Sequence, residues 1–91
     1  MARADRQYTD SLMVWLARTV PNTDGRMWHL VQGSSTYDRM WRVCEADIVT
    51  NAAGISGPWG YFHADIASGR TESDLQGKLD AFLAGYAYRD R

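Results

Sequence analysis

Two stretches decide the fold: "WRVCEADI" at 41–48 and "WGYFHADI" at 59–66. Each begins with Trp and ends with Ala-Asp-Ile, and both are rich in the aromatic and branched residues that favour β-strands. Their offset of eighteen residues is too short, and repeated too few times, for a solenoid. An antiparallel pair explains the likeness better, because with Trp41 opposite Ile66 each strand's Trp meets the other strand's Ile.

Further strands and turns are predicted on either side of these stretches. Residues 26–32, "RMWHLVQ", form a strand that the "GSST" turn at 33–36 connects to a longer strand at 37–49. Residues 50–58 are small and contain glycine, which predicts a mobile loop. The third strand covers 59–67. The sequence therefore predicts a three-stranded antiparallel meander.

A helix is predicted on each side of the strands. In the first, at 10–20, Thr9 or Asp10 caps the start and Pro21 stops the run. An alternating pattern in this segment keeps a strand open as the alternative. The apolar residues with helical spacing are Leu12, Trp15, Leu16 and Val20.

The C-terminal helix has the clearest pattern. A single apolar stripe runs along Leu75, Leu79, Phe82, Leu83 and Tyr86. Thr71 and Asp74 resemble a capping box before it, and Gly85 is expected to mark its end. The element order α-β-β-β-α predicts a small α+β fold: one domain over 1–91, with a three-stranded antiparallel meander and helices packed on it.

The proposed register divides the sheet into two faces. Trp28 lies opposite Trp41 if the turn pairs Gln32 with Tyr37. Glu45 is a misfit on the core face, and a β-bulge near 45–46 would resolve it. The predicted core face contains Trp28, Leu30, Trp41, Val43, Phe62, Ala64 and Ile66.

The opposite face is the predicted partner-binding surface, because monomeric proteins seldom leave such an apolar patch to water. Arg42 would lie across from Asp65 as a cross-strand pair. The first helix, a second copy of the chain or a different protein are the three candidates to cover this face. Its predicted partner-binding residues are Met27, His29, Met40, Arg42, Ile48, Trp59, Tyr61 and His63.

Catalytic and metal sites have little support in the sequence. The register places Cys44 across from His63, with His29 nearby, and such groups can form a nucleophile or part of a metal site. No CxxC, HxH or HExxH spacing accompanies them. A half-buried thiol beside a surface imidazole is the simpler interpretation. We therefore expect no enzyme activity, no metal and no cofactor.

Nucleic-acid binding is the alternative function. The element order resembles that of the double-stranded-RNA-binding domain. This resemblance implies a lysine-rich start to the last helix. This chain has Glu72 and Asp74 in that place. A net charge of −1 and a pI near 6.0 also argue against a phosphate-backbone binder. Such binding would use Trp and Tyr stacking with Arg18, Arg26, Arg39, Arg42 and Arg70.

The sequence favours a non-enzymatic protein-binding module that covers a partner's surface. The chain contains four Trp and five Tyr in 91 residues. Both residue types are enriched at protein interfaces. Small inhibitors of host complexes from phages and mobile elements, anti-CRISPR proteins among them, have this character. The apolar outer face also predicts homo-oligomers. A polar N-terminus, a single cysteine and the lack of a long apolar run predict a cytoplasmic protein without a membrane segment.

Overall fold

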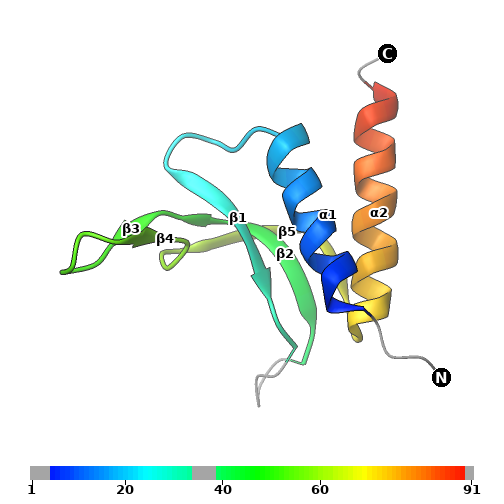
Figure 1. The fold of residues 1–91 in the computed structure, drawn as a ribbon, viewed down its shortest axis with the longest axis horizontal. Coiled ribbons are helices and arrows are strands. Elements are labelled where there is room, and N and C mark those ends of the chain that lie inside the picture. The colour runs from blue at the N-terminus through cyan, green and yellow to red at the C-terminus, as the bar shows by residue number, and fades with distance from the viewer. Residues whose placement is uncertain (1–4, 34–38, 90–91) are drawn as a thin grey trace.

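The structure is a computed structural model that describes residues 5–33 and 39–89, with the side chains of 88 and 89 left out. A three-stranded antiparallel sheet has the order β1-β2-β5, and a separate two-stranded hairpin, β3-β4, lies in the chain between β2 and β5 (Figure 1). The predicted α+β fold with an antiparallel meander is confirmed. The elements are α1 (Arg6–Thr19), β1 (Arg26–Val31), β2 (Trp41–Asp47), β3 (Val49–Thr50), β4 (Ser56–Gly57), β5 (Phe62–Gly69) and α2 (Glu72–Arg89).

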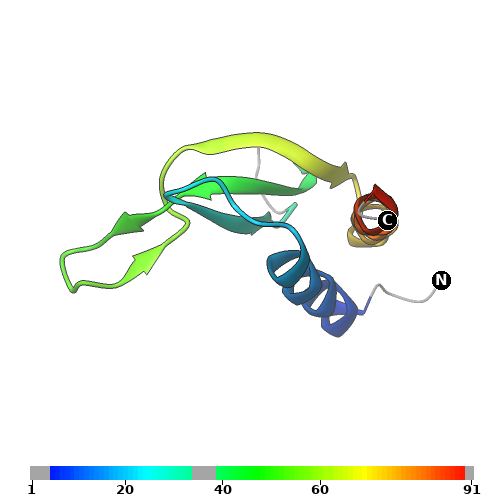
Figure 2. The same cartoon turned by 90° about the horizontal axis from the view of Figure 1, so that it is seen from above.

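Both helices cover the same face of the sheet, and the β3-β4 hairpin points away from them (Figures 1 and 2). The opposite face, which α1 was a candidate to cover, is therefore left open by both helices. Neither helix is long and apolar enough, over the described residues, to cross a bilayer. The buried core contains Leu12, Leu16, Val20, Val43, Ala67, Leu75, Leu79 and Leu83.

Helix α1 begins earlier than the sequence predicted. Asp5, rather than Thr9 or Asp10, is the N-cap, and its side chain accepts a hydrogen bond from the Gln7 N–H at 2.9 Å. Thr9 is fully buried, and its hydroxyl donates to Glu72 of α2 at 2.7 Å. The helix ends before Pro21, as predicted. Of the apolar residues with helical spacing, Leu12, Leu16 and Val20 are buried, whereas Trp15 remains 40% exposed.

Helix α2 follows the predicted stripe. Its three leucines are fully buried, and Phe82 and Tyr86 pack against them. The Asp74 N–H donates to the Thr71 hydroxyl at 3.1 Å, which confirms half of the capping box. Gly85 does not end the helix, which continues to Arg89, and Tyr86 directly after this glycine packs against the core.

Strands β1 and β2 keep the predicted faces in a different register. Trp28 pairs with Glu45 instead of Trp41, and Leu30 pairs with Val43. The shift is four residues along β2, and an even shift leaves every side chain on its predicted face. The predicted pairing of Gln32 with residue 37 falls on a position outside the described residues.

Strand β5 departs further from the prediction. Trp41 lies opposite Gly69 rather than Ile66, and the register shifts twice between Val43 and Ala46. Each shift adds a residue in β5, so the bulges lie in β5 rather than in β2 near 45–46, and Glu45 stays on the helix-facing side with Trp28. The partner of Trp41 is also shifted by three residues, from Ile66 to Gly69, and an odd shift exchanges the faces; Phe62 therefore lies on the outer face, opposite Ala46, and is 46% exposed. Ala64 is exposed as well, so neither residue belongs to the core as predicted.

The strand boundaries also differ from those predicted. Strand β2 begins at Trp41 rather than at residue 37, although 37 and 38 themselves lie outside the described residues. Strand β5 begins at Phe62 instead of Trp59 and reaches Gly69. Trp59 and Tyr61 therefore precede the strand, and the alternation used to place them on the outer face does not apply to them.

Candidate protein-binding surface

The segment between β2 and β5 is a hydrogen-bonded hairpin, which we call the arm (residues 48–61), rather than the predicted mobile loop. At its tip the Asn51 carboxamide oxygen accepts from the N–H groups of Ala53 at 2.9 Å and Ile55 at 3.0 Å. Gly54 has a φ of +81° and donates its N–H to the Asn51 carbonyl at 3.0 Å. The Asn51 side chain thus orders a turn that the composition predicted to be mobile.

One face of the arm carries exposed apolar side chains, and we call it the arm patch (Val49, Ile55 and Trp59). Val49 pairs with Gly57, so the two residues share a face, and the two-residue period extends this face to Ile55. The Trp59 ring lies against Gly57, where an added Cβ would come within 2.5 Å of it. The three side chains are 42%, 59% and 54% exposed, respectively.

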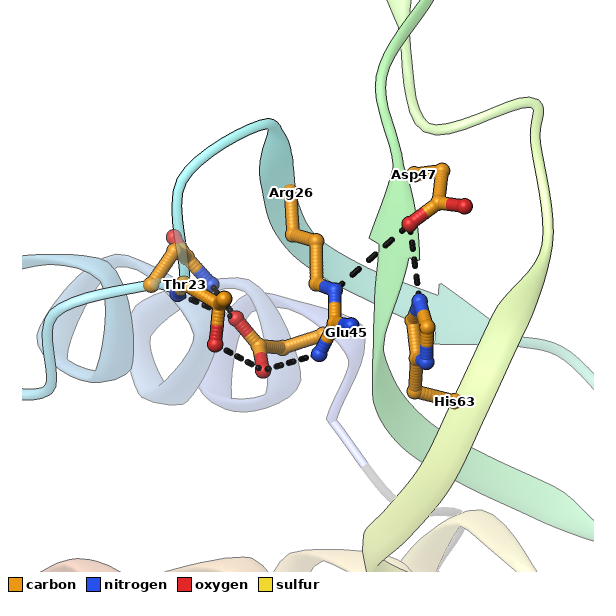
Figure 3. A network of polar contacts seen from close by, with 6 residues as sticks. Thr23, Arg26, Glu45, Asp47 and His63 are labelled. Atoms are coloured by element: carbon orange, nitrogen blue, oxygen red, sulfur yellow. Dashed lines mark hydrogen bonds and ion pairs between the residues drawn. The ribbon is translucent and has the colours of Figure 1, made fainter.

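Asp47 fixes the base of the arm to the main sheet. Its N–H donates to the Tyr61 carbonyl at 2.9 Å, and its own carbonyl accepts from the Gly60 N–H at 3.0 Å. Its carboxylate lies 2.7 Å from His63 Nε2 and 3.5 Å from Arg26 Nε (Figure 3). Backbone and side-chain contacts at one residue therefore set the direction in which the arm leaves the sheet.

Glu45 joins this network to the loop that follows α1 (Figure 3). Its carboxylate accepts from the Thr23 N–H at 2.8 Å and from Asn22 Nδ2 at 3.1 Å, and Arg26 Nη1 lies 3.7 Å away. Burial by itself raises the pKa of Glu45. The hydrogen bonds and the Arg26 charge outweigh that effect, so the pKa lies below its usual value. Glu45, the charged residue predicted on the core face, is thus ionised at the edge of the core and holds the loop after α1 to β2.

The open face of the sheet carries a second apolar group, the sheet patch (Met27, His29, Ile48 and Phe62). Met27 and Phe62 both lie opposite Ala46 and are 37% and 46% exposed. The His29 and Phe62 rings lie 4.9 Å apart, and burial lowers the pKa of His29. The Ile48 N–H donates to the Gly25 carbonyl at 2.8 Å, which continues the β1-β2 pairing by one residue, so alternation places Ile48, 42% exposed, on the same face.

The predicted partner-binding residues are thus spread over several surfaces. Tyr61, at 70% exposed, packs edge-on against His63 at the base of the arm, with ring centroids 4.8 Å apart. Arg42 lies opposite Ser68 rather than Asp65, but the predicted ion pair forms, with Arg42 Nε and Asp65 Oδ2 3.6 Å apart. Met40 is half-buried before β2 begins.

Sequence reasoning missed three exposed apolar residues: Val49, Ile55 and Phe62. A signal for the first two was present in the sequence, because 48–62 contains no Asp, Glu, Lys or Arg, although 23% of the chain is charged. A long charge-free segment that is not a buried strand indicates a contact surface. Phe62 could not be placed in this way, because its face depends on the register of β5.

Cys44 and His63 do not form the pair considered from the sequence. Cys44 lies opposite Asp65 and is 1% exposed, while His63 bonds to Asp47 instead. Burial, with a smaller effect of Asp65, raises the pKa of the Cys44 thiol against the opposing effect of Arg42. Over the described residues, no group of three or more His, Cys, Asp or Glu side chains could hold a metal ion.

Comparison with known proteins adds no relative: no protein-family model, curated protein or solved structure matches this chain. The function must therefore be argued from the surfaces themselves.

Proposed function

We propose that this protein is a non-enzymatic protein-binding module that acts by covering a partner's surface, with the arm patch and Tyr61 as its main contacts. The observation that carries the proposal is a hairpin that projects from the sheet (Figure 1) and contains no charged residue. Its Trp59 and Tyr61 side chains are 54% and 70% exposed. Trp and Tyr are the residues that most often dominate binding energy at interfaces.

The hydrogen bonding of the arm supports this function. Backbone N–H groups at the tip already have partners in Asn51, so a partner can cover them without leaving them unsatisfied. The base is fixed through Asp47. A preordered contact surface loses little conformational entropy on binding, and more of the contact energy therefore appears as affinity.

The charge distribution favours a protein partner over a nucleic acid. Two arginines that nucleic-acid binding would use are close to carboxylates: Arg26 to Glu45 and Asp47, and Arg42 to Asp65. The start of α2 carries Glu72 and Asp74. A phosphate backbone needs several available cations to release its counterions. The arm, by contrast, offers aromatic and aliphatic contacts with no charge to desolvate.

The most concrete form of this proposal is a small inhibitor, encoded by a phage or mobile element, that occludes part of a host complex in the cytoplasm. Its support is the small size of the chain and the aromatic content of the arm. A buried, free Cys44 fits a reducing compartment.

Affinity capture from the native host tests the proposal. The wild type should retain a protein partner that the Trp59→Ala, Tyr61→Ala double variant loses. Each ring is expected to contribute about 2 kcal/mol to binding. The two contributions are not fully additive, so the double variant should lose affinity by about 30-fold or more. The matched control is Tyr8→Ala, Trp15→Ala, because these α1 aromatics are 44% and 40% exposed away from the arm.

A salt series on the captured complex separates protein from nucleic-acid binding. Retention should change little between low and high salt, since the arm has no charges, whereas phosphate contacts would weaken steeply. Capture that survives the arm substitutions, or that the α1 control abolishes, contradicts the proposal.

A further inference from the structure

We propose that the sheet patch is the contact between two copies of this chain, which stack their open sheet faces about a twofold axis. The face is the side of β1, β2 and β5 that both helices leave open (Figure 2). Antiparallel sheets stack through such faces about 10 Å apart.

The residues on this face suit a flat apolar contact. Cys44 and Ala46 lie at its centre, are 1% and 0% exposed, and offer no cavity for a protruding side chain. The exposed area comes from Met27, Phe62 and Ile48 around them. Stacked sheets bring such side chains from two faces into interdigitating layers. Apolar area of this kind stabilises an association when a second face of similar shape covers it.

The charges on this face make it complementary to a copy of itself. Arg42 and Asp65 lie together on it, 3.6 Å apart and opposite in sign. In a twofold contact residue i of one copy meets residue j of the other, and j meets i. A twofold axis that passes close to this pair places the second copy's Asp65 near Arg42 and its Arg42 near Asp65, and both contacts are attractive. A face with charges of one sign would repel itself.

This contact leaves the arm patch free for a different protein. Val49 and Ile48 are consecutive in the chain, so their side chains point to opposite sides, one in the arm patch and one in the sheet patch. The dimer would then carry two copies of the arm. Its existence does not depend on the proposed function, and each is tested by substitutions on its own patch.

Sedimentation equilibrium of the purified chain tests the dimer. The wild type is expected to be dimeric, and Met27→Asp is expected to raise the dissociation constant at least 30-fold by burying an unpaired charge. Ile55→Asp is the matched control, because Ile55 is 59% exposed on the arm patch; it should leave the dimer intact. Circular dichroism and thermal melting establish that each variant is folded.

A charge exchange tests the twofold pairing itself. Arg42→Asp alone and Asp65→Arg alone should each be monomeric where the wild type is dimeric, because each places like charges together. An equimolar mixture of the two should recover a dimer, since every cross-contact is again between opposite charges. A wild type that is monomeric up to about 1 mM overturns the proposal and leaves the face to a foreign protein. A dimer lost in Ile55→Asp, or a mixture that stays monomeric, overturns it as well.

Discussion

Glu45 shows how one charged side chain holds the helix layer to the sheet. Its place on the helix-facing side was predictable from strand alternation, and so was its conflict with an apolar core. Its partners were not predictable, because Asn22 and Thr23 reach it only through the path of the loop after α1. Composition indicates that such a loop exists but does not indicate where its N–H groups point.

Replacing Glu45 with Gln should therefore destabilise the fold without changing its shape. The loss of a charged acceptor for several hydrogen bonds should lower the free energy of unfolding by about 1–3 kcal/mol. Urea denaturation followed by circular dichroism measures it. Asp24→Asn is the matched control in the same exposed loop and should change stability by less than about 0.5 kcal/mol. Equal effects of the two substitutions would contradict the anchoring role.

The strands show which parts of the fold composition predicts and which it does not. β1 and β2 have regular alternation, so their faces were predicted although their register was not. No residue type announces the register of β5, whose partner for Trp41 is Gly69 rather than Ile66; this odd shift exchanges the faces, and Phe62 and Ala64 were misplaced for this reason. In the arm, Asn51 and Gly54 mark a tight turn, and the charge-free stretch around them marks a surface. These signals could have predicted the hairpin.

The glycines of α2 give a prediction about that element. An added Cβ at Gly77 or Gly85 would meet nothing within 4 Å. Either one replaced by Ala should stabilise the protein by about 1 kcal/mol, which raises Tm by about 4–8 °C for a domain of this size.

Gly69→Ala is the matched control for these substitutions. Its Cβ would lie 2.6 Å from Asp74 Cβ and 2.7 Å from the Leu75 nitrogen, so it should lower Tm. Differential scanning calorimetry measures all three. A fall in Tm for Gly77→Ala would mean that an unseen contact covers the helix there.

In the whole molecule, two carboxylates join elements that are far apart in the sequence. Glu45 ties the α1–β1 loop to the sheet, and Glu72 ties α2 to α1 through Arg6 at 2.8 Å and Thr9 at 2.7 Å. Burial alone raises the pKa of Glu72, but the hydrogen bonds from Thr9 and Arg6 and the Arg6 charge lower it below the usual value. Both links therefore depend on ionised glutamates.

The protein should accordingly lose stability in acid. A carboxyl whose pKa is lower in the folded state contributes stability above its unfolded value, 4.5 for Glu, and loses that contribution as pH falls through the folded value. Burial lowers the pKa of His29, which acts in the same direction below 6.5.

Urea denaturation at a series of pH values measures this loss. The free energy of unfolding should decline slightly below pH 6.5, through His29, and more steeply from about pH 5 downward, through the two glutamates. The double variant Glu45→Gln, Glu72→Gln should decline less steeply, because two of the titrating groups are gone. Parallel curves for the wild type and the double variant would show that other groups govern acid unfolding.

A substitution at Gly57 would change the binding surface of the arm during evolution. The residue is buried beneath the Trp59 indole, whose ring carbons would lie 2.5 Å from any new Cβ. A single codon change at 57 must therefore swing the largest ring of the arm to a new position, while leaving every exposed residue chemically the same. Selection for a different partner, in nature or in a display library, should therefore repeatedly yield substitutions at this buried position.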